Sequence, residues 1–416
     1  MARTGIYKFL NVDSIMKMKA LLLFSSLLLC ALPSGAETRN IDGINYDISA
    51  KFKTATVTAL TSGLYAGSIV VPDEVTVDGT TYPVTAIGGR AFSSCHELTS
   101  VTLPPGITTI GEYAFDNCTS LKSLSLPDSL RQMERYAFTR SGLTSIRIPG
   151  TLATIPGNAF TWCVSLASVY LSDGVTTISN GAFSDCRSLT RIRIPETVTN
   201  LGSSIFFRCT SLETVMLPES VHTLPFALFW RCSKLSYIII SDSVYTVGDY
   251  VFAECPNLTT VYMGKNVRSI EEGAFSDCPE LTDVYCCMEG LPRMQKDVFK
   301  NSYIDYATLH VPETAFEAYS NAEPWKNFKE IVTWEGDLSV GVSAPQRAPL
   351  RASGRHGVVT VYGAPADTEL QVFDLSGRLV GSAKAKGEQT HIVTSLNKPQ
   401  IVVVRAGEAK LKLSLR

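Results

Sequence analysis

The stretch IGGRAFSSCHELTSVTLPPGITT, residues 87–109, is followed at once by IGEYAFDNCTSLKSLSLPDSLRQ, residues 110–132. The two stretches are equal in length and carry an apolar residue, Ala-Phe, Cys, Leu and alternating apolar residues at matching places. A fixed period of this length is typical of a repeat architecture. The Phe recurs ten times at a nearly constant spacing, at Phe92, Phe115, Phe138, Phe160, Phe183, Phe206, Phe229, Phe252, Phe275 and Phe299.

Other columns keep the same period. An apolar residue lies five places before each Phe, from Ile87 to Met294, and two apolar residues one apart, such as Ile192 and Ile194, follow each of the first nine. That alternation indicates a short strand with one buried face. One such unit cannot bury its apolar columns, whereas stacked copies can. The sequence therefore predicts a solenoid of about ten repeats with a parallel sheet on one face.

The full pattern, apolar-x-x-x-Ala-Phe-x-x-Cys-x-x-Leu-x-x-Val-x-Leu-Pro, resembles the BspA-type leucine-rich repeat of surface proteins from Bacteroidetes. The resemblance implies an α/β-type leucine-rich-repeat solenoid over residues 87–306. It further implies a β-rich N-terminal cap at 37–86 and a C-terminal cap at 307–338. Members of such a family are expected to be exported and to act by recognition rather than by catalysis.

The N-terminus has the order of a secretory signal. Two lysines precede an apolar run at 20–32, and small residues lead up to a cleavage point after Ala36. We therefore expect residues 1–36 to be removed, with 1–15 as an extension upstream of the natural start. The apolar run is too short for a stable membrane span, and the mature chain has no predicted transmembrane segment. Cys30 leaves an outer-membrane lipoprotein as the alternative.

Eight of the 11 cysteines occupy one column of the repeat, three places after the Phe, and Ser141 fills a gap in it. Equivalent side chains in a stack point the same way, whereas a disulfide has strict directional geometry. We therefore predict buried free thiols, which behave as small apolar groups. Disulfides are the alternative in an exported chain. The column consists of Cys95, Cys118, Cys163, Cys186, Cys209, Cys232, Cys255 and Cys278.

The remaining composition and motifs argue against nucleic-acid binding, catalysis and metal binding. Lys and Arg number 37 against 39 Asp and Glu, a net charge of −2, which argues against a nucleic-acid partner. None of the five His belongs to a recognised catalytic motif, and there is no phosphate-binding glycine loop. A zinc site is disfavoured because no CxxC pair is present. We therefore predict no enzyme, no catalytic residue, no cofactor and no metal.

The residues between the inward apolar pairs should face outward on the sheet. They are mostly Ser and Thr in the first repeats, and Tyr, Arg, Met and Ile in the later ones. These larger types are enriched at the energetic centres of protein interfaces. The alternative is that they only stabilise the sheet by pairing across strands. The predicted binding stripe consists of Tyr170, Arg191, Arg193, Met216, Tyr237, Ile239, Tyr262 and Tyr285.

Beyond the repeats, residues 339–357 are rich in Ser, Pro, Gly and Arg and are predicted to be a linker. Residues 358–416 alternate apolar and polar side chains, which predicts a small all-β domain. Its segments LQVFDLSGRLV and IVVVRAGEAKLKLSL resemble the C-terminal sorting domain of the type IX secretion system, which implies transport across the outer membrane. Pro399-Gln400-Ile401 stands where that family carries Gly-Val/Ile-Tyr, so a domain kept only for stability is the alternative.

Together these features predict an exported, monomeric protein at the cell surface or in the medium. The resemblance implies adhesion to host matrix, host cells or other bacteria through protein–protein recognition. A glycan-binding or nutrient-capture accessory is the alternative, because tyrosines along a sheet also suit sugar stacking. The expected partner is thus an extracellular protein or glycan.

Overall fold

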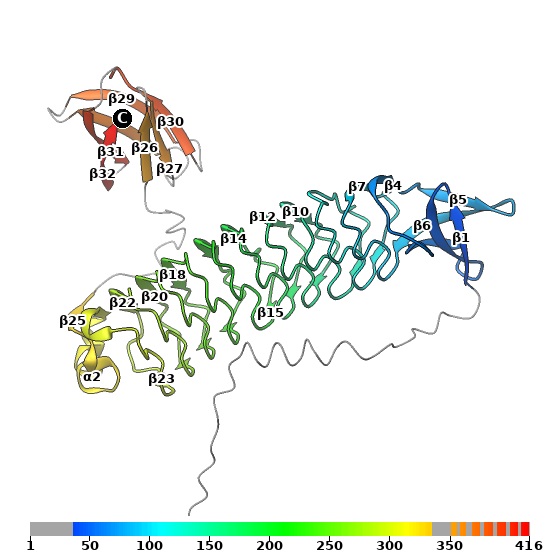
Figure 1. The fold of residues 1–416 in the computed structure, drawn as a ribbon. Helices are drawn as coiled ribbons and strands as arrows, with labels where there is room; N and C mark the ends of the chain where they lie inside the picture. The colour runs from blue at the N-terminus through cyan, green and yellow to red at the C-terminus, as the bar shows by residue number, and fades with distance from the viewer. Residues whose placement is uncertain are drawn as a thin grey trace, which may run out of the picture.

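A computed structural model describes residues 36–334 and the segments 351–355, 358–362, 368–374, 378–385, 389–396, 400–406 and 409–415. The expected signal segment up to residue 35, with its Cys30, lies outside the described residues, as do 335–350. Residues 36–334 form one elongated solenoid (Figure 1). None of the helices among the described residues is long and apolar enough to cross a bilayer.

The N-terminal segment starts both sides of the solenoid. Strand β3 pairs with β2 on one side and with β6 on the other, and β6 continues into the repeats by pairing with β8. Strand β4 pairs in parallel with β7 of the first repeat. The strands are β1 (Ala36–Ile41), β2 (Ile44–Ser49), β3 (Thr54–Thr58), β4 (Gly67–Val70), β5 (Glu74–Val77) and β6 (Thr80–Ile87).

The predicted parallel sheet is confirmed on one side of the solenoid. It contains a four-stranded part, β10-β12-β14-β16, and a five-stranded part, β18-β20-β22-β24-β25. Along most of its strands the inward apolar residues are buried and the intervening residues face outward, as in Ser145–Ile148. Its strands are β7 (Leu98–Thr102), β10 (Ser145–Ile148), β12 (Ser168–Leu171), β14 (Arg191–Arg193), β16 (Thr214–Met216), β18 (Tyr237–Ile240), β20 (Thr260–Met263), β22 (Asp283–Cys286), β24 (Thr308–Val311) and β25 (Glu330–Thr333).

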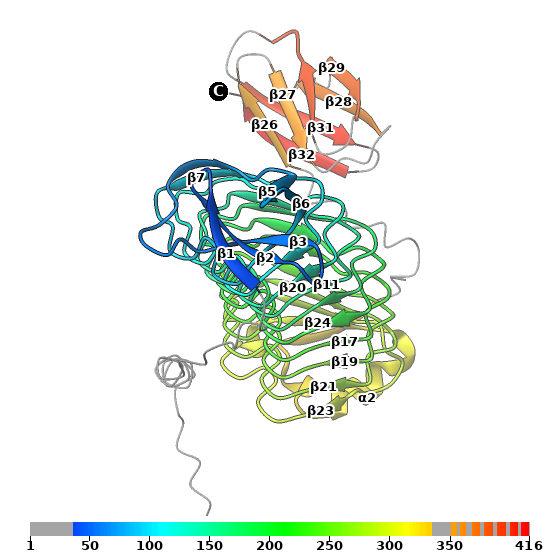
Figure 2. The ribbon, with the colours of Figure 1, turned by 90° about the vertical axis from the view of Figure 1, so that its right-hand side faces the viewer.

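A second parallel ladder, which the sequence analysis did not predict, runs along another side of the coils (Figure 2). Its strands are very short, too short to show a period in the sequence. Most of them end on the apolar residue five places before each Phe, which turns inward. They are β8 (Thr109–Ile110), β9 (Gln132–Met133), β11 (Thr154–Ile155), β13 (Thr177–Ile178), β15 (Asn200–Leu201), β17 (Thr223–Leu224), β19 (Thr246–Val247), β21 (Ser269–Ile270) and β23 (Arg293–Met294).

Between the two ladders, the segments that carry the Phe are turns rather than α-helices throughout residues 87–303, so the α part of the predicted α/β solenoid is minor. They join consecutive coils by backbone hydrogen bonds, such as Phe115 N–H to the Ala137 carbonyl at 2.7 Å. The described residues contain one α-helix, in the C-terminal cap. The helical elements are η1 (Ile304–Tyr306), η2 (Glu313–Ala315), α2 (Phe316–Asn321) and η3 (Trp325–Asn327).

The ten Phe side chains form one buried stack along the solenoid axis. Consecutive ring centroids lie 5.0–6.0 Å apart with the ring planes within 15° of parallel. Such a separation follows from the spacing of parallel strands, about 4.8 Å, and gives the offset arrangement that aromatic pairs favour. Tyr65 covers the first ring at 4.9 Å, and Trp325 and Phe328 meet the last ring edge-on.

The cysteine column is buried beside the Phe stack, and all ten described cysteines are free thiols. Each thiol from Cys118 onward in the column lies 3.0–3.3 Å from the Phe carbonyl oxygen of the preceding coil and donates to it. Ser302 occupies the tenth place and donates to the Phe275 carbonyl at 2.5 Å. A small donor therefore suits this position, which explains Ser at 302; the Ser141 hydroxyl lies 3.3 Å from the Cys163 sulfur in the same column.

The C-terminal residues form two antiparallel sheets, β26-β27-β30 and β29-β28-β31-β32, around a separate apolar core. Residues 351–355, assigned above to the linker, form β26 instead. This strand lies at a sheet edge and pairs with one neighbour, so its polar sequence needs no apolar alternation. The strands are β26 (Arg351–Arg355), β27 (Val358–Tyr362), β28 (Glu369–Asp374), β29 (Leu379–Lys384), β30 (Gln389–Val393), β31 (Gln400–Ala406) and β32 (Ala409–Leu415).

Candidate interaction surface

The structure places all eight residues of the predicted stripe on the outward face of the first sheet, in two rows. Strand register aligns Arg147 with Tyr170, and Arg193 with Met216. Further along, Ile239, Tyr262 and Tyr285 are aligned in the same way. Arg191 and Tyr237 lie in the parallel row, two residues earlier on their strands. The alternation of each strand thus brings residues far apart in sequence onto one surface.

The stripe divides into two parts of different character. We call Tyr170, Arg191, Arg193 and Met216 the Arg–Tyr–Met patch; these residues lie on β12, β14 and β16. Tyr170 is 63% exposed and Met216 is 41% exposed, high values for side chains with so much apolar surface. Tyr170 makes no ring contact within the described residues. An exposed aromatic, an arginine and a methionine on neighbouring strands form the kind of surface that binds proteins.

The second part is a self-packed column of rings. The rings of Tyr262 and Tyr285 stack with centroids 4.4 Å apart, and Tyr285 stacks on His310 at 4.0 Å. Trp334 meets Tyr285 edge-on at 5.1 Å. We call these four residues the ring column. Because the rings lie against one another, their edges rather than their faces point away from the sheet.

A hydrogen bond from the other row helps to fix the ring column. Nε2 of His310 lies 2.9 Å from Oδ1 of Asp283, which stands one strand away in the other row. Burial raises the pKa of the Tyr262 and Tyr285 hydroxyls, and the nearby Asp283 raises them further.

The sequence analysis missed His310 and Trp334, which extend the stripe into the cap. A signal for His310 was present, because it stands between Leu309 and Val311, both fully buried, in the alternation of the other strands. The Phe column does not continue into the cap after Phe299, so the repeat pattern gives no register for the strands of the cap. Trp334 directly follows β25, the last strand of the solenoid, and no alternation in the sequence pointed to it.

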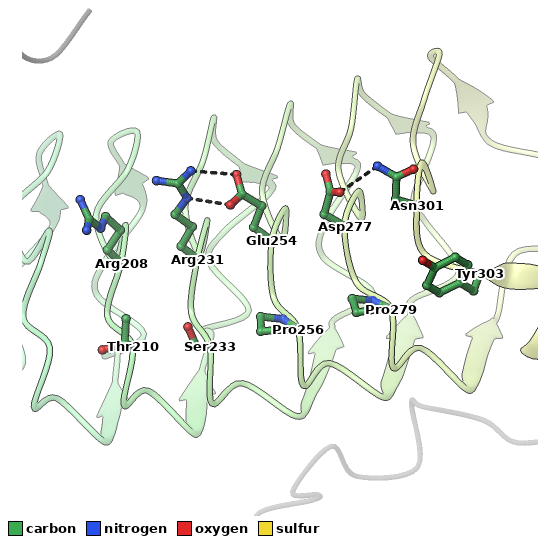
Figure 3. Close-up of a pocket in the computed structure, with 10 residues that line it drawn as sticks. All are labelled: Arg208, Thr210, Arg231, Ser233, Glu254, Pro256, Asp277, Pro279, Asn301 and Tyr303. Atoms are coloured by element: carbon green, nitrogen blue, oxygen red, sulfur yellow. Dashed lines mark hydrogen bonds and ion pairs between the residues drawn. The ribbon is translucent and has the colours of Figure 1, made fainter. Parts of the chain in front are cut away.

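A shallow groove of about 820 Å³ runs along the turns that follow the Phe positions of the later coils. Figure 3 shows the residues that line it. Its charged groups have partners within the chain. Arg231 forms a two-point ion pair with Glu254 at 2.9 and 3.2 Å, and Asp277 accepts a hydrogen bond from Asn301 at 2.9 Å. Arg208 is turned toward Asp185, with 3.6 Å between the charged groups. Since its charges are already satisfied, the groove is better explained as a stabilising ladder than as a ligand site.

The described residues contain no candidate metal centre. Within the ranges that the structure covers, no three His, Cys, Asp or Glu residues cluster so as to hold a metal ion. The thiols of the cysteine column are buried, and burial raises their pKa values, so they are poor nucleophiles. What the described surface offers is a long sheet face with exposed contact residues.

A parallel-sheet solenoid built from coils of nearly constant length, with a stacked apolar core and an outward sheet face, defines a leucine-rich-repeat protein. The family described as BspA type leucine-rich repeat region matches residues 85–213 and 206–322, in six copies. The chain belongs to this family. The predicted family resemblance is therefore confirmed for the repeats.

Solved structures similar to this chain include a leucine-rich cell surface protein from Faecalibacterium prausnitzii, 24% identical, covering 73% of this chain and 96% of that one, with a TM-score of 0.42. A leucine-rich repeat protein from Bacteroides ovatus is 21% identical over 71% of this chain and 99% of its own, with a TM-score of 0.40. The T. pallidum leucine-rich repeat protein is 29% identical over 52% and 87%, with a TM-score of 0.37. The search of curated proteins found no match to this chain.

Proposed function

We propose that this chain is an exported, non-catalytic recognition protein that acts as a monomer at the cell surface or in the medium. It binds another protein through the outward face of the first sheet and so mediates adhesion to host matrix, host cells or other bacteria. The observation that carries this proposal is the Arg–Tyr–Met patch. Tyr170 on β12 and Met216 on β16 leave large apolar surfaces exposed on either side of β14, without cover from the described part of the chain.

A protein partner is favoured over a glycan by the geometry of the ring column. Sugar stacking requires an open aromatic face, yet the ring faces of Tyr262, Tyr285 and His310 are stacked against one another. Among the aromatic residues of the predicted stripe, Tyr170 alone is exposed, and the other three are half-buried. One open ring suits an anchor in a protein interface better than a platform for a chain of sugars.

Replacing Tyr170 and Met216 together by Ala is expected to weaken capture of a protein partner by at least about 30-fold, the loss typical of interface hot spots. The measurement is a pull-down from host-matrix and bacterial-envelope extracts, followed by quantification of each captured protein. Tyr245→Ala is the matched control, because Tyr245 is an exposed tyrosine beside the second ladder. Equal capture by the wild type and the double variant would contradict the proposal, as would an equal loss in Tyr245→Ala.

For export, we propose that the signal segment 1–36 directs secretion and that residues 358–416 act as a type IX sorting domain in a Bacteroidetes cell. The two antiparallel sheets around their own core suit a compact sorting module. Deleting 358–416 is expected to remove most of the protein from the cell surface and leave it in the periplasm. Fractionation with an antibody against the solenoid measures this, and undiminished surface protein would exclude the sorting role.

A further inference from the structure

The four-stranded part of the first sheet carries only positively charged groups on its outward face. The strands β10, β12, β14 and β16 carry three arginines and no carboxylate at their outward positions. The remaining outward groups are neutral. These positions are Ser145, Arg147, Ser168, Tyr170, Arg191, Arg193, Thr214 and Met216.

The arginines differ in how they are held. Nη1 of Arg147 lies 2.9 Å from Oδ1 of Asp128, so its charge is balanced within the chain. Arg193 is exposed, and its guanidinium makes no hydrogen bond or ion pair within the described residues. It stands in line with Tyr170 and is paired in register with Met216. An unbalanced guanidinium is therefore flanked by the two most exposed apolar side chains of these four strands.

The carboxylates at the turns that follow these strands do not balance Arg193. Glu196 accepts the backbone N–H of Glu219 at 2.9 Å. Asp173 and Glu219 are exposed and form no ion pair with the arginine. The charge of Arg193 is thus available to a partner that binds to the outward face of the sheet.

We propose that the partner presents a carboxylate-bearing, extended polypeptide segment to this patch, with an Asp or Glu side chain paired to Arg193 and apolar side chains lying over Tyr170 and Met216. This inference rests on the function proposed above and specifies the chemistry of the partner. Three neighbouring strands span about 10 Å, the length of roughly three residues of extended chain. A guanidinium forms two parallel hydrogen bonds with a carboxylate, and the flanking apolar contacts exclude water from the pair.

The direct test uses labelled random copolymers of glutamate and tyrosine as the probe, with polyglutamate, polylysine and heparin alongside. Binding to the purified chain from residue 37 onward is measured by fluorescence anisotropy at two salt concentrations. The glutamate–tyrosine copolymer is expected to bind best, with affinity that falls as salt rises. Arg193→Ala should weaken it at least 10-fold, and Arg193→Lys should recover only part of the loss.

The matched control is Arg293→Ala, because Arg293 is an exposed strand arginine on the second ladder and its removal changes the net charge equally. It should alter binding less than twofold. Failure of the copolymer to bind, or equal losses in both variants, would overturn the inference. So would heparin binding that depends on Arg193, which would assign the site to sulfated glycans. Protein capture that depends on Tyr170 but not on Arg193 would leave the proposed function intact and remove this inference alone.

Discussion

Raising the pH above about 9 is expected to unfold the solenoid within roughly one to two pH units, in the presence of a reducing agent. The cause is the buried thiol column. Burial raises the pKa of nine cysteines above the ordinary value of 9.0, to about 12 for Cys118, Cys163 and Cys278. Desolvation of the thiolate is the largest cause in each case.

The sign of the effect follows from proton binding. Well below pH 9 the thiols are neutral in both the folded and the unfolded chain, so their ionisation does not change the free energy of unfolding. Above pH 9 the unfolded chain releases these protons while the folded chain retains them, so the free energy of unfolding falls. Each thiol lowers it by up to about 1.4 kcal/mol per pH unit, so the nine together lower it by at most roughly 12 kcal/mol per pH unit. A domain is typically stable by about 5–15 kcal/mol.

Urea titrations at several pH values, followed by circular dichroism, measure this dependence. Thiolate absorbance in the ultraviolet should appear together with the loss of structure, not before it. A variant with Ser at Cys209, Cys232 and Cys255 should show a shallower pH dependence, because Ser already occupies this column at 141 and 302. Thiolates that titrate near pH 9 in a chain that stays folded would contradict the expectation.

Phe183→Ala is expected to lower the free energy of unfolding by about 3–5 kcal/mol. Phe183 is fully buried and stacks between Phe160 at 5.4 Å and Phe206 at 6.0 Å. Its loss leaves a cavity in the middle of the stack, where the neighbouring coils are fixed by backbone hydrogen bonds on several sides and relax little. Denaturant unfolding at neutral pH measures the change.

Phe52→Ala provides the control, since this Phe is 69% exposed and lies outside the stack. Its removal should change stability by less than about 0.5 kcal/mol. A loss for Phe183→Ala no larger than that of the control would mean that the stacked rings add little to the core. A large loss in both variants would mean that the exposed ring is also packed in solution.

Much of the architecture was accessible from the sequence because each column of the repeat has one role. The Phe column predicted the core, and Ile192 with Ile194 predicted the inward side of a strand; both side chains are buried. The second ladder was not accessible, because so short a strand has no period. Nor was the left-handed backbone of the turns, where residues such as Arg208 and Arg231 have positive φ in place of glycine.

Within the repeats, the sequence by itself determined the period of the coils, their register and the identity of the side chains on each face, since a repeat fixes which positions are equivalent. Only the tertiary structure decided how those side chains share the surface. It stacked Tyr262, Tyr285 and His310 against one another and left Tyr170, Arg193 and Met216 open. The physical reason is that stacking depends on which ring lies on the adjacent strand, and strands a whole repeat apart in the sequence become neighbours only when the coils pile up.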